Sequence, residues 1–162
     1  MLSRIFDFDI EEKLASIMSA DKIKGMLFST LQERLLICPI IKELEESKMD
    51  SLFNKNIEDI FYDTFGITSD INLYGDKALW VSMMYIKLFY KYKKSFSYLF
   101  SVISLEDMFN KFKIYHEMDI SQLFDYYEFK EKESTLLTRL IQKDHLTISK
   151  LSVLTRINYN TI

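Results

Sequence analysis

The chain has 162 residues, of which 48% are hydrophobic and 15% aromatic, and its formal net charge is −3. This composition excludes a disordered chain, and the negative charge argues against a protein that coats nucleic acid. Only three glycines and one proline are present. Because sheets and hairpins need such turn residues, the sequence predicts an all-α fold, an irregular bundle of roughly seven to nine helices.

Apolar residues that recur at helical spacing predict most of these helices. Pro39 is expected to end or kink the second of them, Gly66 to stop the fourth, and Ser104 to cap the seventh. A loop is expected over 67–75. The predicted helical segments are 10–18, 23–36, 40–46, 56–65, 77–94, 95–103, 104–114 and a further one that begins at Asp119 or Ser121.

The segment 77–94 is apolar round much of its surface, which is typical of a helix at the centre of a bundle or at an interface. Several large side chains in and after it should therefore be largely buried, in the monomer core or in a dimer seam. These are Trp80, Met83, Phe89, Leu99 and Phe112.

A run of charged residues from Glu128 to Glu133 is expected to interrupt the helices and to separate two units. The first is a helical body over 1–133, and the second is a segment over 134–162 that begins with a helix capped by Ser134. Residues 134–162 hold four cationic side chains against one carboxylate, a net charge of +3, which leaves −6 on residues 1–133. A basic tail on an acidic body suits an end that is steered towards DNA.

The tail from Leu146 to Ile162 has the pattern of a short helix, a tight turn and the start of a second helix. Apolar Leu151 and Ile157 lie at positions that such a pair buries. This layout resembles the helix-turn-helix of phage-repressor-like DNA-binding proteins, in which the second helix enters the major groove. Arg156 stands where the turn of that family usually has glycine. We expect the reading helix to continue beyond Ile162, so that residues 134–162 hold only the start of the DNA-binding segment.

The resemblance implies that the partner is double-stranded DNA. Because a repressor helix contacts only a short half-site, it also implies a homodimer that presents two tails. The residues expected to bind DNA are Thr147, Ser149 and Lys150 at phosphates, Asn158, Tyr159 and Asn160 at base edges, and Arg156 in the turn.

The apolar segment 77–94 is followed by a region rich in tyrosine and phenylalanine. These rings either form an aromatic core or, in part, line a ligand pocket or a dimer seam, because large rings suit both roles. The passage 80–100 resembles effector domains of tetracycline-repressor-type regulators, which implies a small-molecule or protein effector. The candidates for this ligand or dimer surface are Trp80, Met84, Tyr85, Phe89 and Tyr92.

The sequence predicts no enzyme, cofactor or metal site. His116 and His145 are the only histidines and lie far apart, and three scattered glycines cannot form a phosphate-binding loop. Cys38 is expected to be a buried thiol; a single cysteine forms no internal disulfide, which fits the cytoplasm. No apolar run is long enough to cross a membrane, so no membrane partner is expected.

The sequence therefore predicts a DNA-binding transcriptional regulator with a helical body that dimerises or senses an effector. The alternative, from a different class, is a helical protein-interaction module, an inhibitor or scaffold without a nucleic-acid role. An enzyme comes third, because no catalytic pattern is present.

Overall fold

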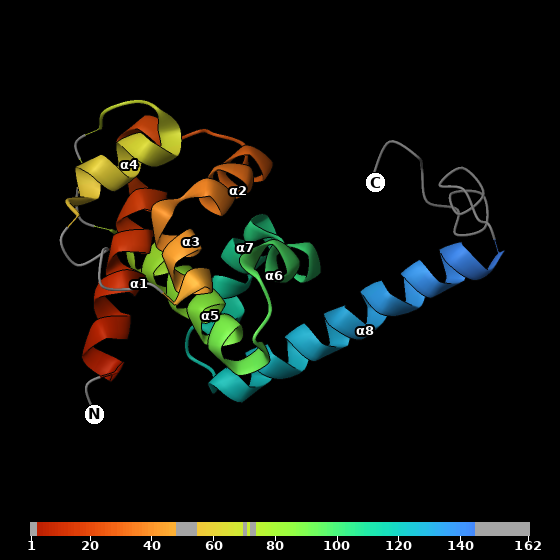
Figure 1. Ribbon diagram of the computed structural model, residues 1–162. Helices are drawn as coiled ribbons and strands as arrows, with labels where there is room; N and C mark the ends of the chain where they lie inside the picture. The colour runs from red at the N-terminus through yellow and green to blue at the C-terminus, as the bar shows by residue number, and fades with distance from the viewer. Residues whose placement is uncertain (1–2, 48–54, 70, 72–73, 145–162) are drawn as a thin grey trace.

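The computed structural model of the protein describes residues 3–47, 55–69, 71 and 74–144. This part of the chain folds into eight α-helices and one short 3-10 helix, with no strand, so the predicted all-α fold is confirmed (Figure 1). In chain order the helices are α1 (Ser3–Ser19), η1 (Asp21–Ile23), α2 (Phe28–Ile37), α3 (Pro39–Glu46), α4 (Ile57–Phe65), α5 (Asp76–Tyr92), α6 (Phe96–Val102), α7 (Leu105–Tyr115) and α8 (Ile120–Asp144).

Helix α5 is the central helix of the bundle. It packs against α1, α6 and α7, and in Figure 1 it runs through the middle of the body beside α1. An amphipathic surface helix buries one stripe, whereas α5 buries side chains on several sides, as its sequence predicts. The buried residues of α5 are Ala78, Val81, Ser82, Met84, Tyr85, Ile86 and Leu88.

Local chemistry at the helix ends follows the sequence closely. Pro39 stands at the first position of α3 and so separates it from α2. Gly66 ends α4 in a left-handed conformation with φ 72°, and its N–H donates to the Tyr62 carbonyl oxygen at 2.7 Å. The Ser104 hydroxyl oxygen accepts from the Asp107 N–H at 3.1 Å and caps α7. The predicted roles of Pro39, Gly66 and Ser104 are confirmed.

The predicted start of the second helix at Ile23 is wrong. Residues Asp21–Ile23 form only a 3-10 turn, and α2 begins at Phe28. The cause is Gly25, which adopts φ 85° and therefore cannot continue a right-handed helix. Leu27, which the apolar pattern assigns to the helix, precedes α2 and is 73% exposed.

Side chains from distant helices supply hydrogen bonds at the starts of α6 and α7. The Phe96 N–H donates to Glu45 Oε1 of α3 at 2.6 Å, and the Leu105 N–H donates to Gln32 Oε1 of α2 at 2.9 Å. The first N–H groups of a helix have no partner within it, so these bonds satisfy donors that would otherwise depend on water. They also tie α3 to α6 and α2 to α7.

Helix α8 contradicts the predicted break over 128–133. The helix continues without interruption from Ile120 to Asp144, and Ser134 lies inside it rather than at a start. Glutamate and lysine are good helix formers, so a charged run does not by itself end a helix. The start was predicted correctly, because Asp119 Oδ1 accepts from the Ser121 N–H at 2.8 Å. The division into a body and a DNA-binding unit stays a prediction.

Burial of the five large side chains is only partly as predicted. Leu99 is fully buried between the helices. The other four are half-buried: Trp80, Met83, Phe89 and Phe112. The first three of these pack against the core. The largest fully buried rings instead belong to Tyr85, Tyr127, Phe61 and Phe96.

Phe61 and its neighbour Tyr62 provide a matched test of this core. Phe61 is fully buried, while Tyr62 is 54% exposed on the same helix. We expect Phe61→Ala to lower the free energy of unfolding by about 3–5 kcal/mol, because it removes a ring from a packed interior. Tyr62→Ala should change it by less than about 1 kcal/mol. Urea denaturation followed by circular dichroism measures both values, and equal losses would show that α4 is peripheral.

Candidate functional site

The seven residues predicted to bind DNA, from Thr147 to Asn160, lie outside the residues that the structure describes. Their assignment stays a prediction. What the structure does describe is the helix that leads to them, because α8 ends at Asp144. How α8 is held therefore decides where the tail begins.

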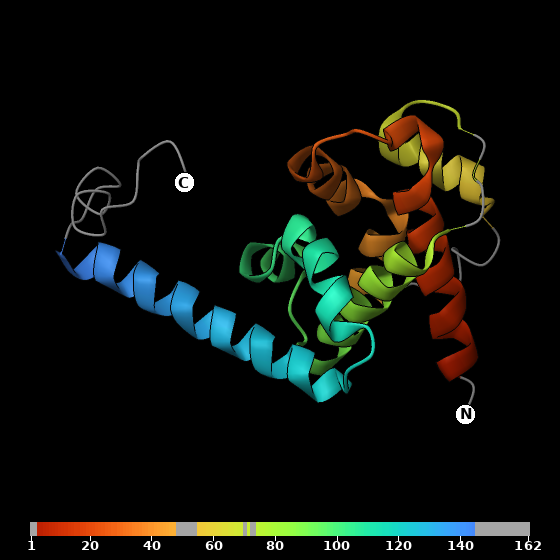
Figure 2. The ribbon, with the colours of Figure 1, turned by 180° about the vertical axis from the view of Figure 1, so that it is seen from behind.

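Among the side chains of α8 that the structure describes, those that pack against the body belong to the first half of the helix. Leu123 and Tyr127 are buried and Glu131 is half-buried, whereas residues 132–135 are exposed. Both ribbon views show the remainder of α8, drawn in blue, extending away from the other helices (Figures 1 and 2). Its 25 residues correspond to about 37 Å at 1.5 Å per residue.

Two tyrosine hydroxyls fasten α8 to the body, and a third bonds to one of the same glutamates from within α8. Tyr92 at the end of α5 donates to Glu128 Oε1 at 2.8 Å, and Tyr98 in α6 donates to Glu131 Oε1 at 2.9 Å. Tyr127 in α8 also donates to Glu131 Oε1, at 3.2 Å. We call these five residues the tyrosine–glutamate cluster. Both glutamates belong to the charged run that the sequence predicts to interrupt the helices.

Aromatic and cationic contacts surround the cluster. The rings of Tyr92 and Tyr127 stack with centroids 4.4 Å apart. The Lys91 ammonium lies 3.7 Å from the centroid of the Phe124 ring and 4.0 Å from Glu128 Oε1. A cation placed over a ring face is attracted by its negative charge distribution. Apolar packing and polar bonds thus act on the same face of α8.

Burial and hydrogen bonding keep the cluster's phenols protonated. The pKa of Tyr92 is raised by burial and by its hydrogen bond to Glu128, and the pKa of Tyr127 is raised by burial and by the charge of Glu131. The pKa of Tyr98 is raised mainly by its bond to Glu131. A hydroxyl beside a carboxylate loses its proton less easily, because the product would place two negative charges together.

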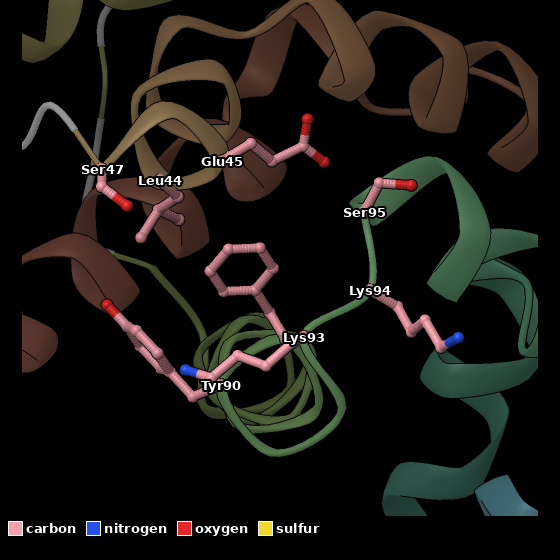
Figure 3. A pocket seen from close by; sticks show the side chains of 8 residues that line it. Leu44, Glu45, Ser47, Tyr90, Lys93, Lys94 and Ser95 are labelled. Carbon is pink, nitrogen blue, oxygen red and sulfur yellow. The ribbon is translucent and has the colours of Figure 1, made fainter.

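A cavity of about 570 Å³ opens at the junction of α3, α5 and α6 (Figure 3). The residues that line it carry apolar, hydroxyl, ammonium and carboxylate groups. The Lys93 ammonium lies 5.4 Å from the centroid of the Tyr90 ring, and the Lys94 ammonium lies 5.1 Å from that of Tyr98. The lining residues are Leu44, Glu45, Ser47, Phe89, Tyr90, Lys93, Lys94 and Ser95.

The five candidates for a ligand or dimer surface do not share one place. Met84 and Tyr85 belong to the core, and the Tyr85 hydroxyl donates to the Ile103 carbonyl oxygen at 2.8 Å, so neither forms a free surface. Trp80 is half-buried with its ring 5.7 Å from that of Phe112. Of the other two candidates, Phe89 lines the cavity, and Tyr92 belongs to the tyrosine–glutamate cluster.

Metal binding, membrane spanning and the thiol of Cys38 can also be considered in the part of the chain that the structure describes. No group of three or more metal-binding side chains occurs among those residues, and none of their helices is both long and apolar enough to span a bilayer. Cys38 is fully buried, as predicted, and burial raises the pKa of its thiol. The ring of His116 stacks on Phe112 at the end of α7.

Comparison with known proteins gives no guide to this site, because no family model, curated protein or solved structure matches the chain. The function is therefore inferred from the chain's own residues.

The tyrosine–glutamate cluster should make the free energy of unfolding depend on pH in the alkaline range. Because the pKa of Tyr92 is higher in the folded than in the unfolded chain, its contribution is fully present below pH 10 and is lost as the pH rises above it. We expect the free energy of unfolding to fall above pH 10, and Tyr92→Phe to make that fall shallower. Urea denaturation at several pH values measures the slope. Tyr62→Phe, at an exposed position of α4, is the control, and an equal effect of both variants would contradict this role.

Proposed function

We propose that the protein is a DNA-binding transcriptional regulator whose tail contacts double-stranded DNA and whose helical body supports dimerisation and sensing. The observation that carries this proposal is the course of α8. The helix leaves the body after Glu131 and continues to Asp144, a further distance of about 20 Å at 1.5 Å per residue. The described end of α8, at Asp144, is thereby well away from the other helices.

The net charges of the two parts of the chain explain why the projection of α8 would favour DNA binding. Residues 1–133 carry a net charge of −6, which DNA phosphates would repel, whereas residues 134–162 carry +3. Lys150 and Arg156 supply +2 of this beyond the end of α8. Interactions between exposed charges are screened beyond about 8 Å at physiological ionic strength. A separation of about 20 Å therefore lets the tail approach phosphates with little repulsion from the acidic body.

In this proposal Lys150, Thr147 and Ser149 bind phosphates and fix the register. Asn158 and Asn160 then face base edges, together with Tyr159, while Arg156 lies in the turn. Phosphate contacts supply affinity, and base contacts supply sequence preference. A homodimer joins two tails, because each reads only a half-site, and half-sites are spaced by about 34 Å or a multiple of it. Two helices that each project about 20 Å from the body are of suitable size for that span.

The alternative is a helical protein-interaction module without a nucleic-acid role. It is favoured by large apolar side chains exposed near the end of α7 and on α8: Ile114 is 53%, Met118 44% and Phe129 57% exposed. Scattered exposed apolar residues are common in monomeric proteins, so this observation is weaker than the course of α8.

A salt-dependent titration with fragments of the protein's own genome tests the proposal, using the protein with its native C-terminus. We expect affinity to fall steeply with salt, because each phosphate contact releases counterions. Lys150→Ala should weaken binding to all sequences and reduce the salt slope by about 0.9. Asn158→Ala should instead reduce the preference between sequences, and Lys113→Ala, at an exposed position of α7, should change neither. If a folded dimer retains no fragment even at low salt, the interaction-module alternative replaces this proposal.

The course of α8 can be tested separately at Ser134, an exposed residue inside the helix. Ser134→Pro removes a helical hydrogen bond and kinks or breaks the helix. We expect it to lower DNA affinity at least tenfold while the body keeps its unfolding midpoint, because the tail loses its fixed direction. Ser134→Ala is the matched control. Unchanged DNA affinity in the proline variant would show that the projecting helix is not required.

A further inference from the structure

We propose that the cavity at the junction of α3, α5 and α6 is an effector site for a small aromatic acid, and that its occupancy alters how firmly α8 is held. The effector role rests on the proposed function, whereas the binding itself does not. The volume of about 570 Å³ lies within the range of roughly 300–1,000 Å³ that small-molecule sites occupy.

The lining favours a ring. Leu44 is buried on the α3 side, and Phe89 and Tyr90 lie on the α5 side. The Phe89 ring is already stacked on Phe96 at 5.2 Å, which fixes its orientation. Stacked and edge-to-face arrangements are favourable between aromatic rings. A flat aromatic ligand therefore has apolar contacts from two helices.

The charges favour an acid. Lys93 places its ammonium group beside the Tyr90 ring, and Lys94 lines the cavity with its ammonium over the Tyr98 ring. Among the described residues neither lysine is in an ion pair. The carboxylate of the lining is that of Glu45, and its Oε1 accepts the Phe96 N–H. An anionic ligand would give Lys93 a charged partner beside the Tyr90 ring. The hydroxyls of Ser47 and Ser95 also line the cavity and can donate hydrogen bonds to anionic groups.

The link to α8 runs through residues 93–95, which join α5 to α6. All three line the cavity. Tyr92, directly before them, bonds to Glu128, and Tyr98, shortly after them, bonds to Glu131. Lys94 lies over the ring of Tyr98, and in Figure 3 its side chain extends away from Leu44 and Ser47. An acid that draws Lys94 into the cavity would draw it off Tyr98 and loosen the tyrosine–glutamate cluster.

Two fluorescent probes with the same rings test the binding. 8-Anilinonaphthalene-1-sulfonate carries an anion, and N-phenyl-1-naphthylamine does not. We expect saturable binding of the sulfonate at one site, about fivefold tighter than the neutral amine, as expected for one exposed ion pair. Lys93→Gln should remove that advantage and leave the amine unaffected, while Lys93→Arg keeps it. Lys113→Gln is the control. Equal affinity for both probes, or no effect of Lys93→Gln, would overturn the site.

The coupling to α8 is tested by reciprocity, because a ligand that loosens the cluster must bind more tightly when the cluster is already loose. We expect Tyr98→Phe to tighten sulfonate binding severalfold, and saturating sulfonate to speed amide exchange over residues 120–131 in the parent protein. Tyr62→Phe is the control and should change neither. Probe binding without these effects would overturn the effector role. No DNA is used, so failure of the DNA-binding proposal is seen separately in the salt titration.

Discussion

The packing of α5 against α1, α6 and α7 is the constraint on which the rest of the structure depends. Polar groups buried in this packing are satisfied: the Ser82 hydroxyl donates to the Glu11 carbonyl oxygen at 2.5 Å, and Tyr85 donates to that of Ile103. An unpaired buried donor would cost about 1–3 kcal/mol. This packing along α5 fixes the position of its C-terminal end. The cavity and the tyrosine–glutamate cluster both lie at that end.

Several carboxylates of this acidic chain form hydrogen bonds between helices. Glu45 of α3 binds the first N–H of α6, while Glu128 and Glu131 of α8 bind tyrosines of α5 and α6. Each carboxylate accepts a hydrogen bond from a donor on another helix, so it fixes the orientation of the two helices as well as holding them together. A hydrogen bond to a specific donor fixes the orientation of a helix better than apolar packing does, because the hydrophobic effect is not directional. The direction of α8 is the property most sensitive to these few bonds.

The junction of α5 and α6 brings two features within a few residues of each other. Residues 93–95 line the cavity, and the tyrosines on either side of them hold α8. The proposed regulatory function needs a connection of this kind between the cavity and α8. In this chain the connection is short and covalent, because it is the linker itself, so it does not require a long path of coupled side chains.

The sequence by itself determined the all-α class and several helix ends, because those depend on local chemistry: Pro39 at the start of α3, Gly66 at the end of α4, and the serine cap of α7. It also indicated, from the apolar surface of α5, a helix at the centre of the bundle or at an interface. Only the tertiary structure decided the role of the run from Glu128 to Glu133. The partners of its glutamates are tyrosines 36 and 33 residues away in the chain, so no local pattern could reveal that these charges fasten α8 to the body. In the same way, Met84 and Tyr85 lie in the core while Phe89 lines a cavity, because packing by α1, α6 and α7 selects which side of α5 is covered.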